Sequence, residues 1–243
     1  MKVQTKQELA RTLDYSILPK QTTREEILFG CQKAREYHFA ALYTSSSYWT
    51  PLVAKELADC PDIEIGTGIS FPFGTAPIEV KTYEMKKALS DGCTAIDMVI
   101  NCGALRSGDV ATVREEVRRL VDLCRGRAVS KCIFDVCFLT EAEIKTVCDL
   151  VLEYGVDYAK TSTGQFEGPT LGQVLLMKKL LAGTPIKLKV AGVKFPRPQN
   201  AVTFLNAGAD RIGTRAAVEI VEAWDQLLAA GLVCPCQSEA AVA

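Results

Sequence analysis

Short apolar runs alternate with longer amphipathic segments along nearly the whole of this 243-residue chain. The runs are apolar at almost every position, which is typical of parallel strands buried on both faces. Such an alternation predicts a parallel sheet covered by helices. Seven runs are predicted strands: residues 40–44, 63–71, 95–101, 130–136, 157–162, 186–191 and 210–213. A short run at residues 13–18 would make an eighth.

The amphipathic segments show helical spacing and recognisable ends. One predicted helix carries its apolar residues on a single face: Val113, Val117, Leu120, Val121 and Cys124. Two predicted helices begin with capping boxes, Thr23 with Glu26 and Thr140 with Glu143. Three glycines stand where a helix must end before the next strand: Gly92, Gly155 and Gly208.

Eight strands that alternate with helices predict an α/β fold, the (β/α)8 TIM barrel. A chain of this length suits one such barrel, so residues 1–232 are predicted to form a single domain. Residues 233–243 lack periodicity and are predicted to be a flexible C-terminal tail. In barrels of this kind the chemistry takes place at the C-terminal ends of the strands.

Composition narrows the functional classes. The 28 basic and 29 acidic residues nearly cancel, so bulk charge predicts neither a nucleic-acid nor a membrane partner. No segment has the length and apolar character of a membrane span or a signal peptide. The ten cysteines are mostly scattered through apolar segments, which favours free thiols in a reducing cytoplasm. One Cys-x-Cys pair, Cys234 and Cys236, with a single histidine (His38, expected at a helix end or surface) predicts no metal site.

Three charged residues interrupt predicted strands near their ends: Asp97, Lys160 and Lys189. A lysine in a buried strand is costly unless it is paired or neutral. Burial and a nearby cation both lower the pKa of an ammonium group, and the neutral amine is a nucleophile. Lys189 could be that cation, and Asp97 could move protons. The alternative is that these charges form structural ion pairs without a catalytic role. Lys187 lies two residues before Lys189 and is expected to point the same way but deeper in the barrel, so it is the residue most easily confused with Lys189.

At these residues the chain resembles the deoxyribose-phosphate aldolase family. The resemblance covers about residues 10 to 225, and its segments occur in the family's order. They are Asp14-Tyr-Ser-Ile-Leu18, Phe71-Pro-Phe-Gly74, Ala95-Ile-Asp-Met-Val-Ile-Asn101 with Gly103-Ala-Leu105, Lys160-Thr-Ser-Thr-Gly164 and Lys189-Val-Ala-Gly192.

The resemblance implies a class I aldolase and assigns roles to individual residues. Lys160 matches the family's Schiff-base lysine, Lys189 the second lysine that lowers its pKa, and Asp97 the acid that relays protons. Lys131 and Asp135 match supporting residues. The candidate substrate-binding residues are Asp14, Thr161, Gly164, Gly192 and Gly213, which lie in segments that match the family, together with Lys194 and Arg215, which lie where the chain departs from it. The iminium is the electron sink, so no cofactor is expected; the partner is a small aldehyde or sugar phosphate, and a homodimer is a further expectation.

The departures from the family's pattern cluster where its members bind phosphate. Val193 replaces a second glycine, and its Cβ limits backbone approach to an anion. Lys194, Arg197 and Arg215 could rebuild a phosphate or carboxylate pocket. Alternatively, the acceptor is a different, unphosphorylated aldehyde, or these loops have drifted without a change of substrate. The competing hypothesis from another functional class is a non-catalytic barrel that binds a metabolite.

A second departure lies after the strand at residues 40–44, where Tyr43-Thr-Ser-Ser-Ser-Tyr48 replaces the family's Cys-Val-Asn-Pro-Ser-Tyr. Tyr43, Ser45 and Ser47 follow or end a strand, so they are candidates for lining the pocket.

Overall fold

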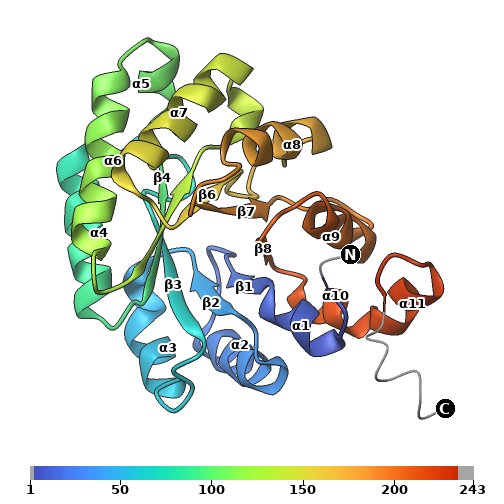
Figure 1. Cartoon of the computed structure of the whole chain (residues 1–243). Coiled ribbons are helices and arrows are strands. Elements are labelled where there is room, and N and C mark those ends of the chain that lie inside the picture. Colours follow the sequence, from blue (N-terminus) through green and yellow to red (C-terminus); the bar gives the residue numbers. More distant parts are fainter. Residues whose placement is uncertain (1–2, 235–243) are drawn as a thin grey trace.

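The computed structural model describes residues 3–234 and contains a closed barrel of eight parallel strands (Figure 1). The strands are β1 (Leu13–Ile17), β2 (Ala41–Thr44), β3 (Glu64–Ile69), β4 (Ala95–Val99), β5 (Val129–Ile133), β6 (Tyr158–Lys160), β7 (Lys187–Ala191) and β8 (Arg211–Thr214). Each strand pairs with the next, and Leu13 pairs with Ile212 to close the ring. The predicted barrel is confirmed, including its short first strand.

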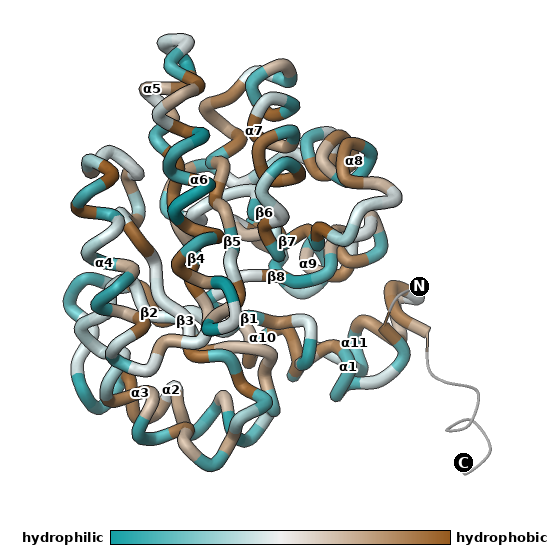
Figure 2. Tube along the Cα trace, turned by 60° about the vertical axis from the view of Figure 1, so that its left-hand side comes forward, coloured by the Kyte–Doolittle hydropathy of each residue, from teal (hydrophilic) through white to brown (hydrophobic). Residues whose placement is uncertain are grey.

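Helices surround the barrel (Figure 1). The α-helices are α1 (Lys6–Arg11), α2 (Arg24–Tyr37), α3 (Thr50–Glu56), α4 (Ile78–Ser90), α5 (Cys102–Arg106), α6 (Val110–Cys124), α7 (Glu141–Tyr154), α8 (Leu171–Leu180), α9 (Arg197–Asn206), α10 (Ala217–Glu222) and α11 (Trp224–Ala229). Two 3-10 turns, η1 (Ser47–Trp49) and η2 (Val136–Phe138), follow β2 and β5. The hydropathy alternates along the outer helices, as amphipathic elements require (Figure 2).

The local sequence explains where several helices begin and end. Both predicted capping boxes are present, and Thr170 with Gln173 forms a third at the start of α8. Gly155 ends α7 in the left-handed conformation (φ 74°), which glycine adopts without steric penalty. His38 ends α2 and is exposed, as expected from the sequence.

The main apolar core lies between the barrel and its helices, whereas the barrel interior holds a separate, small apolar cluster. That cluster consists of Ala41, Tyr43 and Ala95, with Val129 packed against it. Branched apolar side chains usually fill the interior of a TIM barrel. Here charged side chains occupy much of that space, and they form the candidate site described below.

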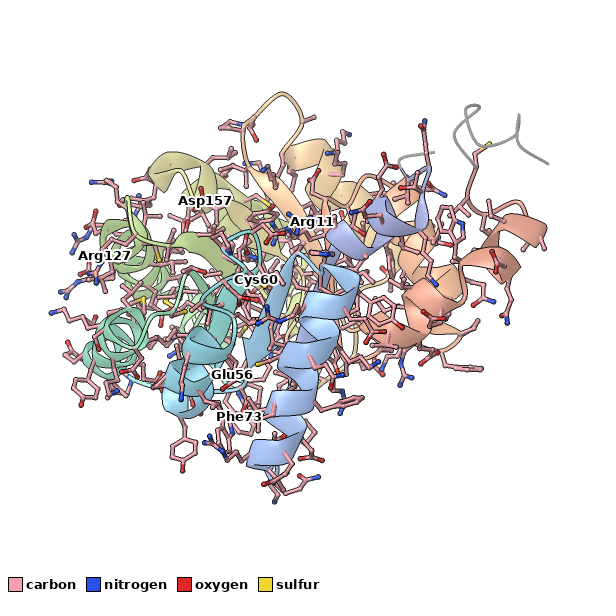
Figure 3. The ribbon with its side chains drawn as sticks, turned by 90° about the horizontal axis from the view of Figure 1, so that it is seen from below. Arg11, Glu56, Cys60, Phe73, Arg127 and Asp157 are labelled. Carbon is pink, nitrogen blue, oxygen red and sulfur yellow. The ribbon has the colours of Figure 1, made fainter. Side chains whose placement is uncertain are left out.

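The N-terminal helix α1 packs against α10, and its last residue, Arg11, reaches the end of the barrel opposite the strand C-termini. Arg11 of α1 forms an ion pair with Asp62, which lies just before β3 (2.9 Å; Figure 3 labels Arg11 and the nearby Cys60).

The nine described cysteines are free thiols, and Cys236 lies outside the described residues. Val233, which we assigned to the tail, is buried at 3% exposure; residues 235–243 of that predicted tail lie outside the described part. No helix among residues 3–234 is long and apolar enough to cross a membrane.

Candidate active site

Three strands bring the three predicted catalytic residues together. Asp97 is the middle residue of β4, Lys160 is the last residue of β6, and Lys189 is the middle residue of β7. Lys160 Nζ lies 2.6 Å and Lys189 Nζ 2.8 Å from the same oxygen, Asp97 Oδ2. The three charges predicted from the sequence therefore form one cluster, although only Lys160 lies at the end of its strand.

The two lysines differ in their access to solvent. Lys160 lines a cavity at the C-terminal end of the barrel, and its side chain is 8% exposed. The Lys189 side chain is 1% exposed and forms a second ion pair with Asp14 (2.7 Å). Lys160 is therefore the amine that a carbonyl compound in the cavity can reach, and Lys189 is the cation held beneath it.

Burial and neighbouring charges set the protonation of this cluster. Burial lowers the pKa of Lys160; Asp97 raises it, and the positive charge of Lys189 lowers it further. Burial alone would raise the pKa of Asp97, but Lys160 and Lys189 outweigh it and hold that pKa well below its usual value. A carboxylate thus stands beside an amine that loses its proton more readily than an ordinary lysine.

A second ionic network lies beneath the cluster. Lys131 Nζ contacts Asp14 Oδ2 at 3.1 Å and Glu64 Oε2 at 2.7 Å. Arg211 binds Glu64 through two nitrogens at 2.8 Å and reaches Asp14 at 3.0 Å. Lys187 does not form the predicted core-end ion pair with a described residue: it is exposed at the start of β7, with its Nζ 5.5 Å from the centroid of the Tyr158 ring, and Lys131 is the buried lysine of this network. Glu64 and Arg211 were missed, although each is a charged residue within an apolar strand.

The cavity above Lys160 has a volume of about 220 Å³, which suits a small metabolite. Its buried lining includes Tyr43, Asp97 and Lys160. The outer lining combines basic and aromatic side chains: Lys194, Arg197 and Arg215 with Phe71, Phe166 and Phe195. A carbonyl group at Lys160 would therefore have cations at the far end of the same cavity.

The predicted substrate-binding residues divide into two groups. Five line the cavity: Gly164, Gly192, Lys194, Gly213 and Arg215. Asp14 and Thr161 do not. Asp14 lies below the cavity, and Thr161 Oγ1 accepts a hydrogen bond from the backbone N–H of Ala191 (3.2 Å), which ties β6 to β7.

Two further residues support the site indirectly. Asp135 lies beyond the end of β5 and does not line the cavity. It accepts hydrogen bonds from the backbone N–H and hydroxyl of Thr163 (2.6 and 3.1 Å), which fixes the loop after Lys160. Gly213 leaves room for a lysine, since a Cβ there would lie 2.9 Å from Lys189 Cε.

The cavity lining includes aromatic residues that the sequence marked only weakly or not at all. Tyr43 was one of three candidates with Ser45 and Ser47; of these, Tyr43 lines the cavity. Phe166 and Phe195 gave no indication of a role because isolated aromatic residues in loops resemble packing residues. The geometry can support covalent catalysis: an amine adds to a carbonyl, and the carboxylate and ammonium beside it transfer protons. A TIM barrel with such a lysine at its C-terminal face has the features of a class I aldolase.

Comparison with known proteins agrees with this class. The chain is 37% identical over 214 residues to a deoxyribose-phosphate aldolase of Bacillus cereus, which covers 88% of this chain and 94% of the relative. It is 36% identical, with the same coverage, to a deoxyribose-phosphate aldolase of Halalkalibacterium halodurans. This chain belongs to the deoxyribose-phosphate aldolase family and is a carbon–carbon lyase. No protein-family model matches it.

A solved structure shows the same fold. The tetrameric deoxyribose phosphate aldolase of Aeropyrum pernix superposes with a TM-score of 0.83 at 28% identity, covering 93% of this chain and 94% of that one.

Proposed function

We propose that the protein cleaves 2-deoxyribose 5-phosphate to acetaldehyde and glyceraldehyde 3-phosphate, and catalyses the reverse condensation, through a Schiff base on Lys160. One observation carries the proposal: the cavity-lining Lys160 shares Asp97 Oδ2 with the buried Lys189. The family's name supports the choice of sugar phosphate.

The positions of Lys160 and Asp97 suggest which residue carries out each step of the cleavage. The Lys160 amine adds to C1 of the open-chain sugar, and loss of water gives an iminium ion. Asp97 Oδ1 is buried and has no hydrogen-bond partner among the described residues, so it is available to take the proton of the C3 hydroxyl. The C2–C3 bond then breaks, C3 leaves as the aldehyde of glyceraldehyde 3-phosphate, and the electron pair forms an enamine. Protonation at C2 and hydrolysis release acetaldehyde and restore the amine.

The cations at the outer end of the cavity support a phosphorylated substrate. Lys194 and Arg215 are exposed, and neither forms an ion pair with a described residue. Arg197 also lines the cavity and has one partner, Glu219, at 3.3 Å. We propose that these three side chains replace the backbone contacts that Val193 restricts. An unphosphorylated acceptor is the competing possibility within the same chemistry.

Turnover with matched substrates tests this function. The full chain is incubated with 2-deoxyribose 5-phosphate or with 2-deoxyribose, and acetaldehyde is measured. We expect release from the phosphate ester at low concentration, loss of release in Lys160→Met, and retention in Lys187→Met, an exposed lysine outside the cavity. Equal cleavage of both sugars would replace the phosphate proposal with the unphosphorylated one; no cleavage of either would contradict the proposed substrate.

Two finer expectations belong to the same proposal. A cytoplasmic location is supported by the nine described cysteines, all of which are free thiols. Assembly into a homodimer is an expectation from the family resemblance, and sedimentation of the purified chain measures it.

A further inference from the structure

The aromatic ring of Tyr43 lies among three lysines inside the barrel. Its centroid is 3.8 Å from Lys189 Nζ, 5.1 Å from Lys131 Nζ and 6.0 Å from Lys160 Nζ. An ammonium group is attracted to an aromatic face within about 6 Å. By distance, the ring therefore favours positive charge most on Lys189 and least on Lys160.

The neighbouring residues hold this ring in place. A Cβ at Gly66 of β3 would lie 2.3 Å from the Tyr43 ring, so the ring occupies space that glycine leaves open. The Tyr43 hydroxyl is buried and makes no hydrogen bond of normal geometry with the described residues, although it lies close enough to Asp97 for that carboxylate to affect its pKa. Burial raises the pKa of Tyr43 well above its usual value, with Asp97 adding to the effect, so the phenol stays neutral. The ring face contacts the lysines and the hydroxyl affects Asp97, so variants that lack the hydroxyl isolate the effect of the ring.

Inside the barrel the cationic side chains outnumber the carboxylates, so the lysines need not all be protonated at the same time. Among the described residues, four cationic side chains (Lys131, Lys160, Lys189 and Arg211) share three carboxylates (Asp14, Glu64 and Asp97). One amine can therefore be neutral without leaving a carboxylate unpaired, and Lys189 has two carboxylate partners where Lys160 has one.

We propose that the ring of Tyr43 is a positioning element that keeps the proton on Lys189 and so leaves Lys160 as the neutral nucleophile. The inference rests on the proposed function for the role of Lys160, but the proton's location can be measured without turnover. Each of the remaining six strands contributes one charged side chain to this cluster, and all six side chains are unchanged in the variants below. They are Asp14, Glu64, Asp97, Lys131, Lys160 and Arg211.

Fluorinated phenylalanines at position 43 change the electron density of the ring face and hardly change the shape of the side chain. Ring fluorines withdraw electron density from the aromatic face and weaken its attraction for a cation. The full chain, labelled with ¹³C and ¹⁵N in lysine, is prepared with Tyr43→Phe and with mono-, di- and trifluorophenylalanine at position 43. The Nζ and Cε resonances of Lys189, assigned with Lys189→Met, are followed against pH.

Tyr43→Phe is the reference for the series, because it lacks the hydroxyl and has an intact ring face. With successive fluorines the Lys189 transition should move to lower pH, because each fluorine weakens the attraction of the ring for the ammonium group. Coincident transitions in the Phe and trifluoro-Phe proteins would overturn the proposal.

The same series connects the ring to catalysis. The upper limb of the pH–rate profile for 2-deoxyribose 5-phosphate cleavage should move with the Lys189 transition, whereas a purely structural role for Tyr43 would lower the rate equally at all pH values. If the wild type cleaves no sugar phosphate, the proposed function fails, and the resonance measurement still decides where the proton lies.

Discussion

Lys160 and Lys189 donate to one oxygen, Oδ2 of Asp97, at 2.6 and 2.8 Å. Two ammonium groups this close repel each other, so the pair favours the state in which one amine is neutral. Lys160 reaches the cavity, while Lys189 remains buried against Asp14. One carboxylate thus holds a nucleophile and its neighbouring cation in fixed relative positions.

Replacement of Lys160 should stabilise the fold. Because burial lowers its pKa in the folded protein, the unfolded chain binds this proton more tightly, and stability through this group rises with pH. The free-energy cost of holding the protonated Lys160 amine in the folded protein is complete below the folded-state pKa. This cost vanishes as the pH approaches the pKa of lysine in the unfolded chain, about 10.4. Lys160→Met should therefore gain on the order of 1 kcal/mol per unit of lowered pKa at neutral pH. Urea unfolding at pH 7 and pH 10 measures this; a gain that does not shrink at pH 10 would contradict it.

Asp97→Asn should lower kcat far more than it raises KM. The change removes the carboxylate that takes the substrate proton and pairs with both lysines, so a loss of about 10²- to 10⁴-fold in kcat is expected. Steady-state kinetics on 2-deoxyribose 5-phosphate gives both constants, and Asp62→Asn, at the opposite end of the barrel, is the control. An unchanged kcat would remove Asp97 from the reaction.

The network beneath the site should control acid stability. Burial would raise the pKa of Asp14, but Lys131, Lys189 and Arg211 hold it well below its usual value. Its charged form therefore contributes stability that is complete above about pH 4 and is lost as the pH falls toward the folded-state pKa.

Asp14→Asn removes one of the three carboxylates that balance four cations inside the barrel, so Lys131 and Arg211 keep only Glu64 and Lys189 keeps only Asp97. The change should destabilise the protein by about 3–5 kcal/mol at pH 7. The difference from the wild type should narrow below pH 4. Asp149→Asn, which breaks an exposed pair with Lys145, should change little. Chemical unfolding at several pH values measures all three proteins, and a pH-independent difference would refute the assignment.

Arg215→Ala should affect the phosphate end of the substrate alone. Loss of one charge-assisted contact of about 1.5–3 kcal/mol should raise KM for 2-deoxyribose 5-phosphate about 10-fold or more. Trapping with acetaldehyde, which carries no phosphate, should be unaffected. Arg125→Ala, an exposed arginine on the outer surface, is the control. An unchanged KM would show that Arg215 does not bind the phosphate.

The sequence predicted those parts of the site that carry a local energetic cost. Lys160 and Asp97 stood out because a charge in an apolar strand needs a partner. The depth of each charge in the barrel could not be predicted, because strand tilt and stagger decide which residues share a level. For this reason a core-end ion pair was expected of Lys187, which is exposed, and Lys131 was not recognised as the buried lysine of that network. Tyr43 was seen only as a candidate lining residue, since its contacts with lysines come from three other strands.

The central claim is that Lys160 forms the covalent intermediate, and reductive trapping tests it most directly. The full chain is incubated separately with acetaldehyde and with 2-deoxyribose 5-phosphate, treated with borohydride, and examined by intact mass and peptide mapping. We predict one reduced adduct per chain from each compound, located on Lys160 and missing in Lys160→Met. An adduct on another lysine, or an unchanged mass with both compounds, would contradict the account.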